Sequence, residues 1–391
     1  MNSKLPTFGI ALTACAALVT IGCGGGGGSP AATTTTTPTP VSGTPGAGDG
    51  GSSAPAASGD AGGGSAPAPS APPPAPAHSA HRHCGWIGAD TFAAGKATFL
   101  AHPDYYDAIH PVWASLNPDG SIRMLAMADD AAIMATAKAH HVKLMPLVAY
   151  DDASYLMNAV STPAGVQAHA QAIADMVAKH GYDGVELDYE HLWSASNRAP
   201  YQATVAAITA LVHAQGKQVS LALPAMDKEY AESGYDYVFL QKTVDTMHLM
   251  GYDFHFLGGD HLGPIAPKGW ISDIVTRVQS LGAPEKYVLG IANYGIGAGW
   301  YTSAKDAASR CTTPRAMTTD HMASCPLGHQ DGGLAPHCAT AQGDVWFEDT
   351  ASMGEKAQLA KAHGLGGVGV YAMGDEPDGF FDAMTAAYPA Q

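Results

Sequence analysis

Three acidic residues stand at every second position of the segment Asp-Gly-Val-Glu-Leu-Asp-Tyr-Glu, which ends at Glu190. Side chains alternate along a β-strand, so Glu186, Asp188 and Glu190 share one face, and the apolar residues between them share the other. Removing a carboxylate from water costs several kcal/mol unless it is paired or neutralised, so an inward-facing row needs a chemical reason. Crowded carboxylates raise the pKa of at least one member, as a general acid requires. The row predicts acid–base catalysis, with Glu190 as the proton donor.

The segments around this strand alternate between short β-rich runs and helical patterns, which is typical of βα units in a parallel sheet. Eight such units in about 300 residues predict an α/β fold, the (β/α)8 TIM barrel, over residues 84–391. Catalytic residues of such barrels lie at the carboxyl ends of the strands, where Glu190 falls. This position favours catalysis over a solvated surface strand or a metal-binding row, the alternatives for the acidic pattern alone. The strands are expected around Trp86 and at 109–113, 142–148, 184–190, 219–224, 246–252, 287–291 and 367–371.

One predicted helix has clear start and stop signals. Ser161 or Thr162 can cap its first turn, which contains Pro163, and Gly181 follows its last turn. Apolar residues recur between these signals at helical spacing, so one face of the helix is expected to pack on the barrel.

The stretch from about 302 to 343 departs from this alternation, because it has little hydrophobic periodicity. Long loops without structure of their own are uncommon unless they are stapled or functional. We therefore expect an insertion after the seventh strand, on the active-site face, pinned by at least one disulfide. Beyond the first 83 residues there are four cysteines, whose three possible pairings stay open: Cys84, Cys311, Cys325 and Cys338.

The N-terminal part is expected to serve export. Lys4 precedes an apolar run that is too short to span a bilayer, so residues 1–23 are interpreted as a signal peptide. The run ends in Thr-Ile-Gly-Cys, which resembles the lipobox of bacterial lipoproteins and makes Cys23 the candidate lipidation site. An ordinary cleaved signal is the alternative. Residues 24–83 are rich in Gly, Pro, Ser and Thr and are expected to form a disordered linker. The protein is thus expected to be a cell-envelope lipoprotein or a secreted protein.

Composition restricts the partners. The chain is 46% hydrophobic and carries a net charge of -16, so it has enough apolar residues for a large core. The negative charge disfavours nucleic acid and anionic membrane surfaces. Membrane contact is expected only through a lipid anchor, and the domain is expected to be a monomer. The cluster His81-Arg82-His83-Cys84 lacks spaced partner ligands, so we expect a solvated stretch there, and no metal or cofactor.

The acidic segment resembles the motif Asp-Gly-x-Asp-x-Asp-x-Glu of glycoside hydrolase family 18, the chitinase family. The resemblance extends over the whole folded part, so it is more specific than one short match. The matching positions are Asp183, Gly184, Glu186, Asp188 and Glu190 in the acidic strand, 250–253 in the sixth strand, 263–267 in the loop after it, 289–291 with 294–295 in the seventh strand, and 366–371 in the last strand.

The resemblance implies a retaining, substrate-assisted glycosidase acting on β-1,4-linked N-acetylglucosamine in chitin, its oligomers or peptidoglycan. Glu190 would protonate the glycosidic oxygen, and the substrate's own 2-acetamido oxygen would attack the anomeric carbon. Asp188 would hold the acetamido N–H, and Tyr252 would hydrogen-bond the same group from the opposite side. The implied substrate-binding residues are Glu186, Asp253, Met250 and Tyr371.

Three positions depart from the family pattern. Glu186 replaces the usual Asp, Tyr371 stands where many members have Trp, and the third strand lacks a Ser-x-Gly-Gly pattern. A lectin-like barrel that binds such sugars without cutting them is one alternative function. An endo-β-N-acetylglucosaminidase acting on N-glycans is another. Because inactive members typically lose the terminal Glu and Glu190 is present, catalysis is expected.

Overall fold

Eight parallel strands close into a barrel, with β1 pairing both β2 and β15. The computed structural model describes residues 83–389 except 151, 228–232, 258, 260–261, 313–315 and 320–332. The barrel strands are β1 (His83–Ile87), β2 (Ala108–Leu116), β5 (Leu147–Tyr150), β6 (Gly184–Tyr189), β7 (Gln218–Pro224), β8 (Thr246–Met250), β9 (Tyr287–Ala292) and β15 (Gly367–Tyr371). The predicted parallel (β/α)8 barrel is confirmed.

The expected signal peptide, Cys23 and the linker up to residue 82 lie outside the described residues, as does Cys325. Within the described part of the chain, no helix combines the length and apolar character needed to cross a membrane.

Each barrel strand coincides with one of the eight predicted runs, but the third run is divided. It forms β4 (Lys143–Leu144) and β5, separated by Met145 and Pro146. Proline has no backbone N–H to donate to a ladder, so the strand is interrupted there. The Pro146 carbonyl still accepts a hydrogen bond from the Glu186 N–H, at 3.0 Å, which keeps this segment attached to β6. A further short strand, β3 (Ile122–Met124), pairs antiparallel with β2.

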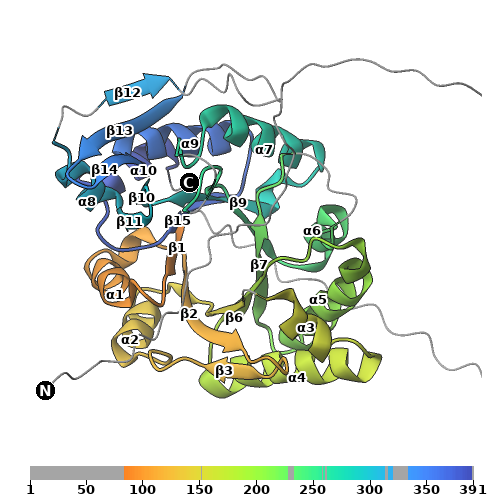
Figure 1. The fold of residues 1–391 in the computed structure, drawn as a ribbon. Coiled ribbons are helices and arrows are strands. Elements are labelled where there is room, and N and C mark those ends of the chain that lie inside the picture. Colours follow the sequence, from red (N-terminus) through yellow and green to blue (C-terminus); the bar gives the residue numbers. More distant parts are fainter. Residues whose placement is uncertain are drawn as a thin grey trace, which may run out of the picture. The chain divides into compact units, whose positions relative to one another are not determined.

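Helices surround the strands, as Figure 1 shows. The Thr162 side chain caps α4 by accepting from the Gly165 N–H, Pro163 occupies its first turn, and Gly181 ends it in a left-handed conformation with φ 71°. The start and stop signals of this helix are thus borne out. The helices are α1 (Phe92–Ala101), α2 (Ala131–Ala139), α3 (Ala153–Ala159), α4 (Pro163–His180), α5 (Arg198–His213), α6 (Tyr237–Thr243), α7 (Lys268–Ser280), α8 (Ala304–Ser309), α9 (Thr350–Ala362) and α10 (Phe380–Ala387).

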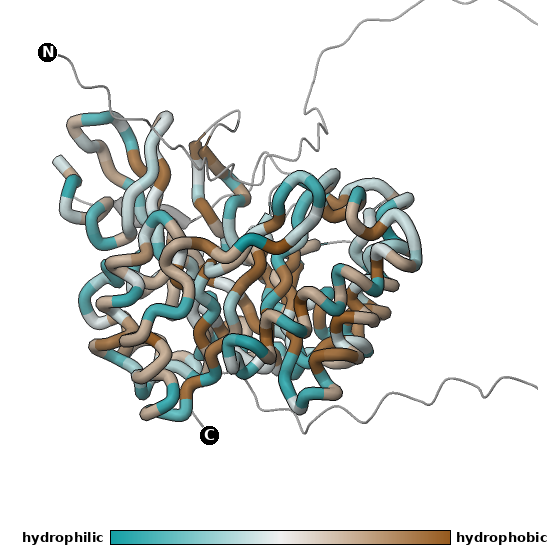
Figure 2. Tube along the Cα trace, turned by 90° about the horizontal axis from the view of Figure 1, so that it is seen from below, coloured by the Kyte–Doolittle hydropathy of each residue, from teal (hydrophilic) through white to brown (hydrophobic). Residues whose placement is uncertain are grey.

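The hydrophobic core lies between the helices and the outward-facing side chains of the barrel strands. Figure 2 shows the apolar segments concentrated in the interior and the hydrophilic ones toward the outside. On β6, Val185, Leu187 and Tyr189 are fully buried in this core, as strand alternation predicts. The acidic residues of the same strand are therefore directed to the other side, into the barrel.

The stretch after β9 forms its own antiparallel sheet, in the order β11-β10-β14-β13-β12. This structure differs from the long loop expected there, because the strands are short and their apolar residues do not follow a clear period. The predicted disulfide in this stretch is confirmed and joins Cys311 to Cys338. The strands are β10 (Tyr294–Gly297), β11 (Trp300–Ser303), β12 (Ala316–Thr319), β13 (Leu334–Thr340) and β14 (Gly343–Phe347).

The prediction that His83 and Cys84 belong to a solvated stretch is wrong. His83 is 5% exposed and Cys84 is 1% exposed, because β1 closes the barrel between β15 and β2. The His83 Nε2–H donates to the Tyr388 carbonyl at 2.7 Å, so its Nδ1 accepts from the Tyr105 hydroxyl at 2.9 Å. Cys84 is a free, buried thiol.

Candidate active site

The acidic row lies at the carboxyl end of β6, with its members at different depths. Glu186 is completely buried, Asp188 is half-buried, and Glu190 is half-buried immediately after the last strand residue. The row thus runs from the barrel interior to the end at which β6 leaves the sheet. This placement agrees with the strand alternation from which it was predicted.

Two tyrosine hydroxyl groups hold the backbone at the end of β6. The Tyr150 hydroxyl donates to the Glu190 carbonyl at 2.8 Å, and the Tyr235 hydroxyl donates to the Tyr189 carbonyl at 3.0 Å. His191, the next residue, has φ 58°, a left-handed conformation that is uncommon for residues other than glycine. These contacts fix the direction in which the chain leaves the strand and so position the Glu190 side chain.

Asp188 is the acid whose pKa is clearly displaced upward. Burial raises its pKa well above the usual value, and the charges of Glu190 and then Glu186 raise it further. Asp188 therefore retains a proton where an ordinary aspartate would be ionised. The predicted crowding of the three acids thus raises the pKa of this residue.

Glu186 is the most deeply buried member of the row and contacts two histidines. Its carboxylate contacts two imidazoles: Oε1 is 2.7 Å from Nδ1 of His248, and Oε2 is 2.5 Å from Nδ1 of His110. Burial alone would raise its pKa, but the two imidazoles outweigh that effect and lower the pKa well below the usual range. The side chain has no exposed surface.

Two tyrosines from different strands form an aromatic wall beside the acids. The rings of Tyr252, which follows β8, and Tyr371, which ends β15, are stacked with centroids 5.3 Å apart. Burial raises the pKa of the Tyr252 hydroxyl well above its usual value, with smaller contributions from Tyr371 and Asp188. Tyr252 thus remains a hydrogen-bond donor at all physiological pH values. Met250, the last residue of β8, is half-buried at the same strand end.

Asp253 is the second carboxyl group with a displaced pKa. Burial raises its pKa to about 6, the hydrogen bond from the Tyr294 hydroxyl lowers it, and the Glu190 charge raises it. Tyr294 belongs to β10, so the inserted sheet contributes a side chain to the site. Asp253 also has φ 61°, a left-handed conformation that places strain at the site.

The pKa of Asp253 predicts a pH dependence of stability. Between about pH 4 and pH 6 the folded protein keeps a proton that the unfolded chain releases, so this residue makes the fold less stable as the pH rises through that window. An Asp253→Asn variant lacks this loss. From pH 4 to pH 7 the free energy of unfolding of the variant should therefore rise relative to that of the wild type, by at most about 3 kcal/mol. The Tm of the variant should rise relative to that of the wild type over the same range. Differential scanning calorimetry measures it, and a constant difference would contradict the prediction.

Several residues that position the site were not predicted from the sequence. Asn293 donates its backbone N–H to the Tyr371 carbonyl at 2.6 Å and its side-chain amide to the carbonyls of Ala372 and Gly374, both at 2.9 Å. It therefore holds the chain at the end of β15 and with it the Tyr371 ring. Trp86 on β1 is fully buried and packs edge-on against Tyr371, with ring centroids 6.4 Å apart.

The arrangement supplies the groups for acid–base chemistry on an uncharged polar substrate. It has a carboxyl group at the strand end, a second carboxyl group with a raised pKa two residues before it, a phenol with a raised pKa, and a further carboxyl group whose pKa is raised to about 6. The electrostatic effects of Glu190 reach Asp188, Tyr252, Asp253 and Tyr371, so these groups form one interacting set.

Known proteins resemble this chain in sequence and in fold. A "Putative sporulation-specific glycosylase YdhD" of Bacillus subtilis (strain 168) is 27% identical over 208 residues, which is 51% of this chain and 49% of that protein. A cortical fragment-lytic enzyme of Bacillus anthracis is 27% identical over 148 residues, 36% of this chain and 34% of that protein. This chain thus spans half or less of the length of these two relatives.

Among solved structures, a chitinase from Chromobacterium violaceum shares the fold with a TM-score of 0.68 and 20% sequence identity. The match covers 80% of this chain and 100% of that one. The family model "Glycosyl hydrolases family 18" matches residues 89–376, which include the acidic row, both wall tyrosines and the inserted sheet. The chain therefore belongs to glycosyl hydrolase family 18.

Proposed function

We propose that this protein is a retaining glycosidase that hydrolyses β-1,4-linked N-acetylglucosamine polymers or oligomers by substrate-assisted catalysis. Glu190 transfers its proton to the glycosidic oxygen as the bond from that oxygen to the anomeric carbon breaks. The 2-acetamido oxygen of the same sugar forms a new bond to the anomeric carbon, which creates a cationic ring. Water then attacks this carbon while the Glu190 carboxylate accepts its proton, so the original configuration is restored.

The observation that carries this proposal is the position of Glu190 at the carboxyl end of β6, two residues after Asp188, whose pKa is raised by burial and by the Glu190 charge. A neutral Asp188 costs little to hold at rest, whereas its ionised form is stabilised when positive charge develops on the acetamido nitrogen. The proton that Asp188 releases passes to the Glu190 carboxylate formed by proton donation, and it returns to Asp188 when water opens the cationic ring. Such an interaction is stronger in the transition state than with bound substrate, which is the condition for catalysis. The proposed mechanism requires no nucleophile from the enzyme, because the acetamido group of the substrate supplies one.

The neighbouring residues support the same assignment. Tyr252 keeps its proton and can donate a hydrogen bond to the acetamido oxygen from the side opposite Asp188. The Tyr371 ring, stacked on Tyr252 and smaller than an indole, provides an apolar surface for a sugar ring. Asp253 offers a carboxyl group for sugar hydroxyls, and Met250 lines the same strand end.

A thiazoline analogue of the cationic ring intermediate tests the mechanism. We expect it to inhibit hydrolysis competitively and at least 10²-fold more tightly than N-acetylglucosamine binds, because transition-state analogues gain at least that factor. Initial product anomers, followed by proton NMR on chitotetraose, should have the β configuration. Indifference to the thiazoline together with an α product would contradict acetamido participation.

The natural polymer is a separate part of the proposal. The purified chain should be assayed by mass spectrometry on chitin oligomers, peptidoglycan and N-glycans in parallel. Cleavage of the first or the second supports the proposed substrate class, and the pattern of products gives the mode of attack. Exclusive cleavage of N-glycans would favour the endo-β-N-acetylglucosaminidase alternative. Binding without cleavage of any of them would favour the lectin-like alternative.

A further inference from the structure

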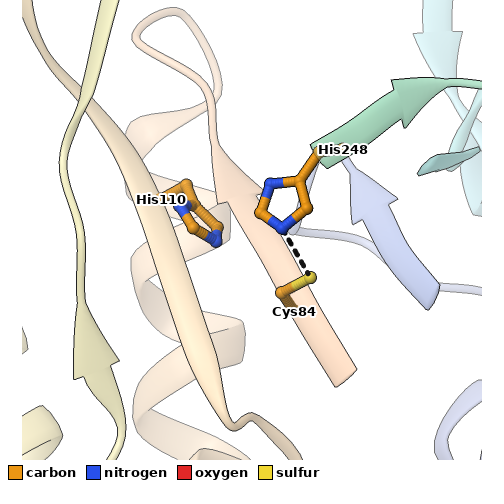
Figure 3. A group of neighbouring side chains, drawn as sticks. All are labelled: Cys84, His110 and His248. Carbon is orange, nitrogen blue, oxygen red and sulfur yellow. Dashed lines mark hydrogen bonds between the residues drawn. The ribbon is translucent and has the colours of Figure 1, made fainter. Parts of the chain in front are cut away.

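A second group of reactive side chains lies inside the barrel, below the acidic row. Cys84 on β1, His110 on β2 and His248 on β8 each present a ligand atom toward a common point, as Figure 3 shows. These three atoms all lie within 4.8 Å of one another. The Cys84 Sγ is 3.9 Å from Nε2 of His248. A thiolate and an imidazole bound to one zinc ion in tetrahedral geometry are about 3.5 Å apart, so this pair would have to close by a few tenths of an ångström.

The two imidazoles are oriented as they are in metal centres. In such centres a ligating histidine usually directs its other ring nitrogen at a carboxylate, which fixes the ring and raises its basicity. Here the Glu186 carboxylate contacts Nδ1 of both His110 and His248, at 2.5 and 2.7 Å. The Nδ1–H of His110 also donates to the Met145 carbonyl at 3.1 Å, and Nε2 of His248 is left facing the Cys84 sulfur.

The surroundings of the cluster are dry and largely apolar. His110, His248 and Glu186 are 0% exposed and Cys84 is 1% exposed. Cys84 packs with Ala108 and Val288 on one side, and Trp86 lies edge-on to His248 with ring centroids 5.4 Å apart. An unbalanced charge would be costly in such a place. A divalent cation in this pocket would therefore need anionic partners, and the Cys84 sulfur and the Glu186 carboxyl group are the two candidates beside the imidazoles.

Gly369 on β15 makes room for this arrangement. A Cβ added at this glycine would lie 2.8 Å from the Trp86 ring and 3.2 Å from the Cys84 sulfur. Any larger residue would displace both side chains. β15 pairs with β1, and Gly369 is the register partner of Cys84, so the strand beside the cluster carries no side chain at this level of the barrel.

We propose that Cys84, His110 and His248 bind one divalent transition-metal ion of the zinc type, with Glu186 as the carboxylate that orients both histidines. The ion ties the first barrel strand to the second and sixth strands of the barrel. Thiolate and imidazole are ligands that zinc prefers over the oxygen-binding cations. Because the cluster is buried, the ion enters during folding and leaves only on unfolding.

Metal analysis of the full chain tests this proposal. The protein is isolated from zinc-supplemented cells, treated with EDTA in the native state, and measured by inductively coupled plasma mass spectrometry. We expect one zinc per chain that resists EDTA, and its loss after unfolding in guanidinium with the chelator. Refolding with Co²⁺ should give the intense near-ultraviolet absorption of a thiolate–cobalt bond. Refolding with Zn²⁺ should give a higher Tm than refolding without metal.

Variants identify the ligands. Cys84→Ser and His248→Gln should lose the metal, whereas Glu186→Gln should retain it with 10- to 100-fold weaker affinity.

The matched controls are His169→Gln, a buried histidine that bonds the Tyr189 hydroxyl instead, and Cys325→Ser, both of which should keep one equivalent. If Cys84→Ser does not fold, the cobalt spectrum of the Cys325→Ser protein tests the ligand instead, because a thiolate–cobalt band in that protein does not come from Cys325. Absence of the thiolate band there, no EDTA-resistant metal, copper alone, or zinc retained by folded Cys84→Ser would overturn the proposal.

Discussion

Glu190→Gln is expected to lower kcat/KM for chitooligosaccharides by about 10²- to 10⁴-fold, the usual contribution of a positioned proton donor. The amide has nearly the same size and keeps the backbone contacts of Glu190 with Tyr150, so the fold and the binding of substrate should persist. Because the amide has no proton to transfer, the sugar leaving group departs as an unstabilised alkoxide. A 2,4-dinitrophenyl leaving group needs no such proton, so release of the first product from that substrate should be affected much less.

The comparison of the two leaving groups separates a chemical role from a structural one. Stopped-flow release of dinitrophenol should show a burst in Glu190→Gln, since the later water attack also needs the carboxylate. Glu285→Gln, at the amino-terminal end of β9 and exposed, is the control and should behave as the wild type. Equal losses on both leaving groups with an unchanged fold, or full turnover of chitotetraose, would refute the role of Glu190.

Asp188→Asn is expected to reduce kcat by about 10²- to 10³-fold, the usual loss on removal of one preorganised electrostatic contact, while KM changes only a few-fold. The raised pKa of Asp188 gives the reason. An asparagine resembles the protonated aspartic acid that the resting enzyme already holds, so the ground state should be preserved. It cannot become anionic when the cationic ring forms, so the transition state loses its stabilisation.

Steady-state kinetics on chitotetraose measure the separate effects on kcat and KM. Calorimetry measures the binding of the intact substrate to the inactive variant. Asp175→Asn on the exposed face of α4 is the matched control and should leave both constants unchanged. A rise in KM with unchanged kcat would instead place Asp188 in uniform substrate binding. The thiazoline should also bind less tightly to Asp188→Asn, because it lacks the anionic partner.

The sequence was sufficient to predict the barrel strands and the position of the acids for a simple physical reason. Apolar β-rich runs such as 219–224 must be buried on both sides of a parallel sheet, so each run marks a strand. Strict alternation places Glu186, Asp188 and Glu190 on one side with no further information. Both signals are local, so they can be interpreted without knowledge of the tertiary structure.

The environment of Glu186 could not be predicted in the same way. Its partner His248 lies 62 residues further along the chain, and His110 belongs to an earlier strand, so no local spacing connects them. The same limit explains the wrong expectation for His83 and Cys84. Their polar sequence suggested solvent, but the closure of the barrel through β1 buries them. The inserted sheet was missed because its pairing is set by contacts among short strands.

The hydrogen bond from Tyr294 to Asp253 has a consequence for protein engineering. An exchange of this region for that of a related enzyme would replace the hydroxyl donor that lowers the pKa of Asp253. Chimeras built at this boundary would therefore have a higher Asp253 pKa, unless the exchanged module also carries a phenol at the same place.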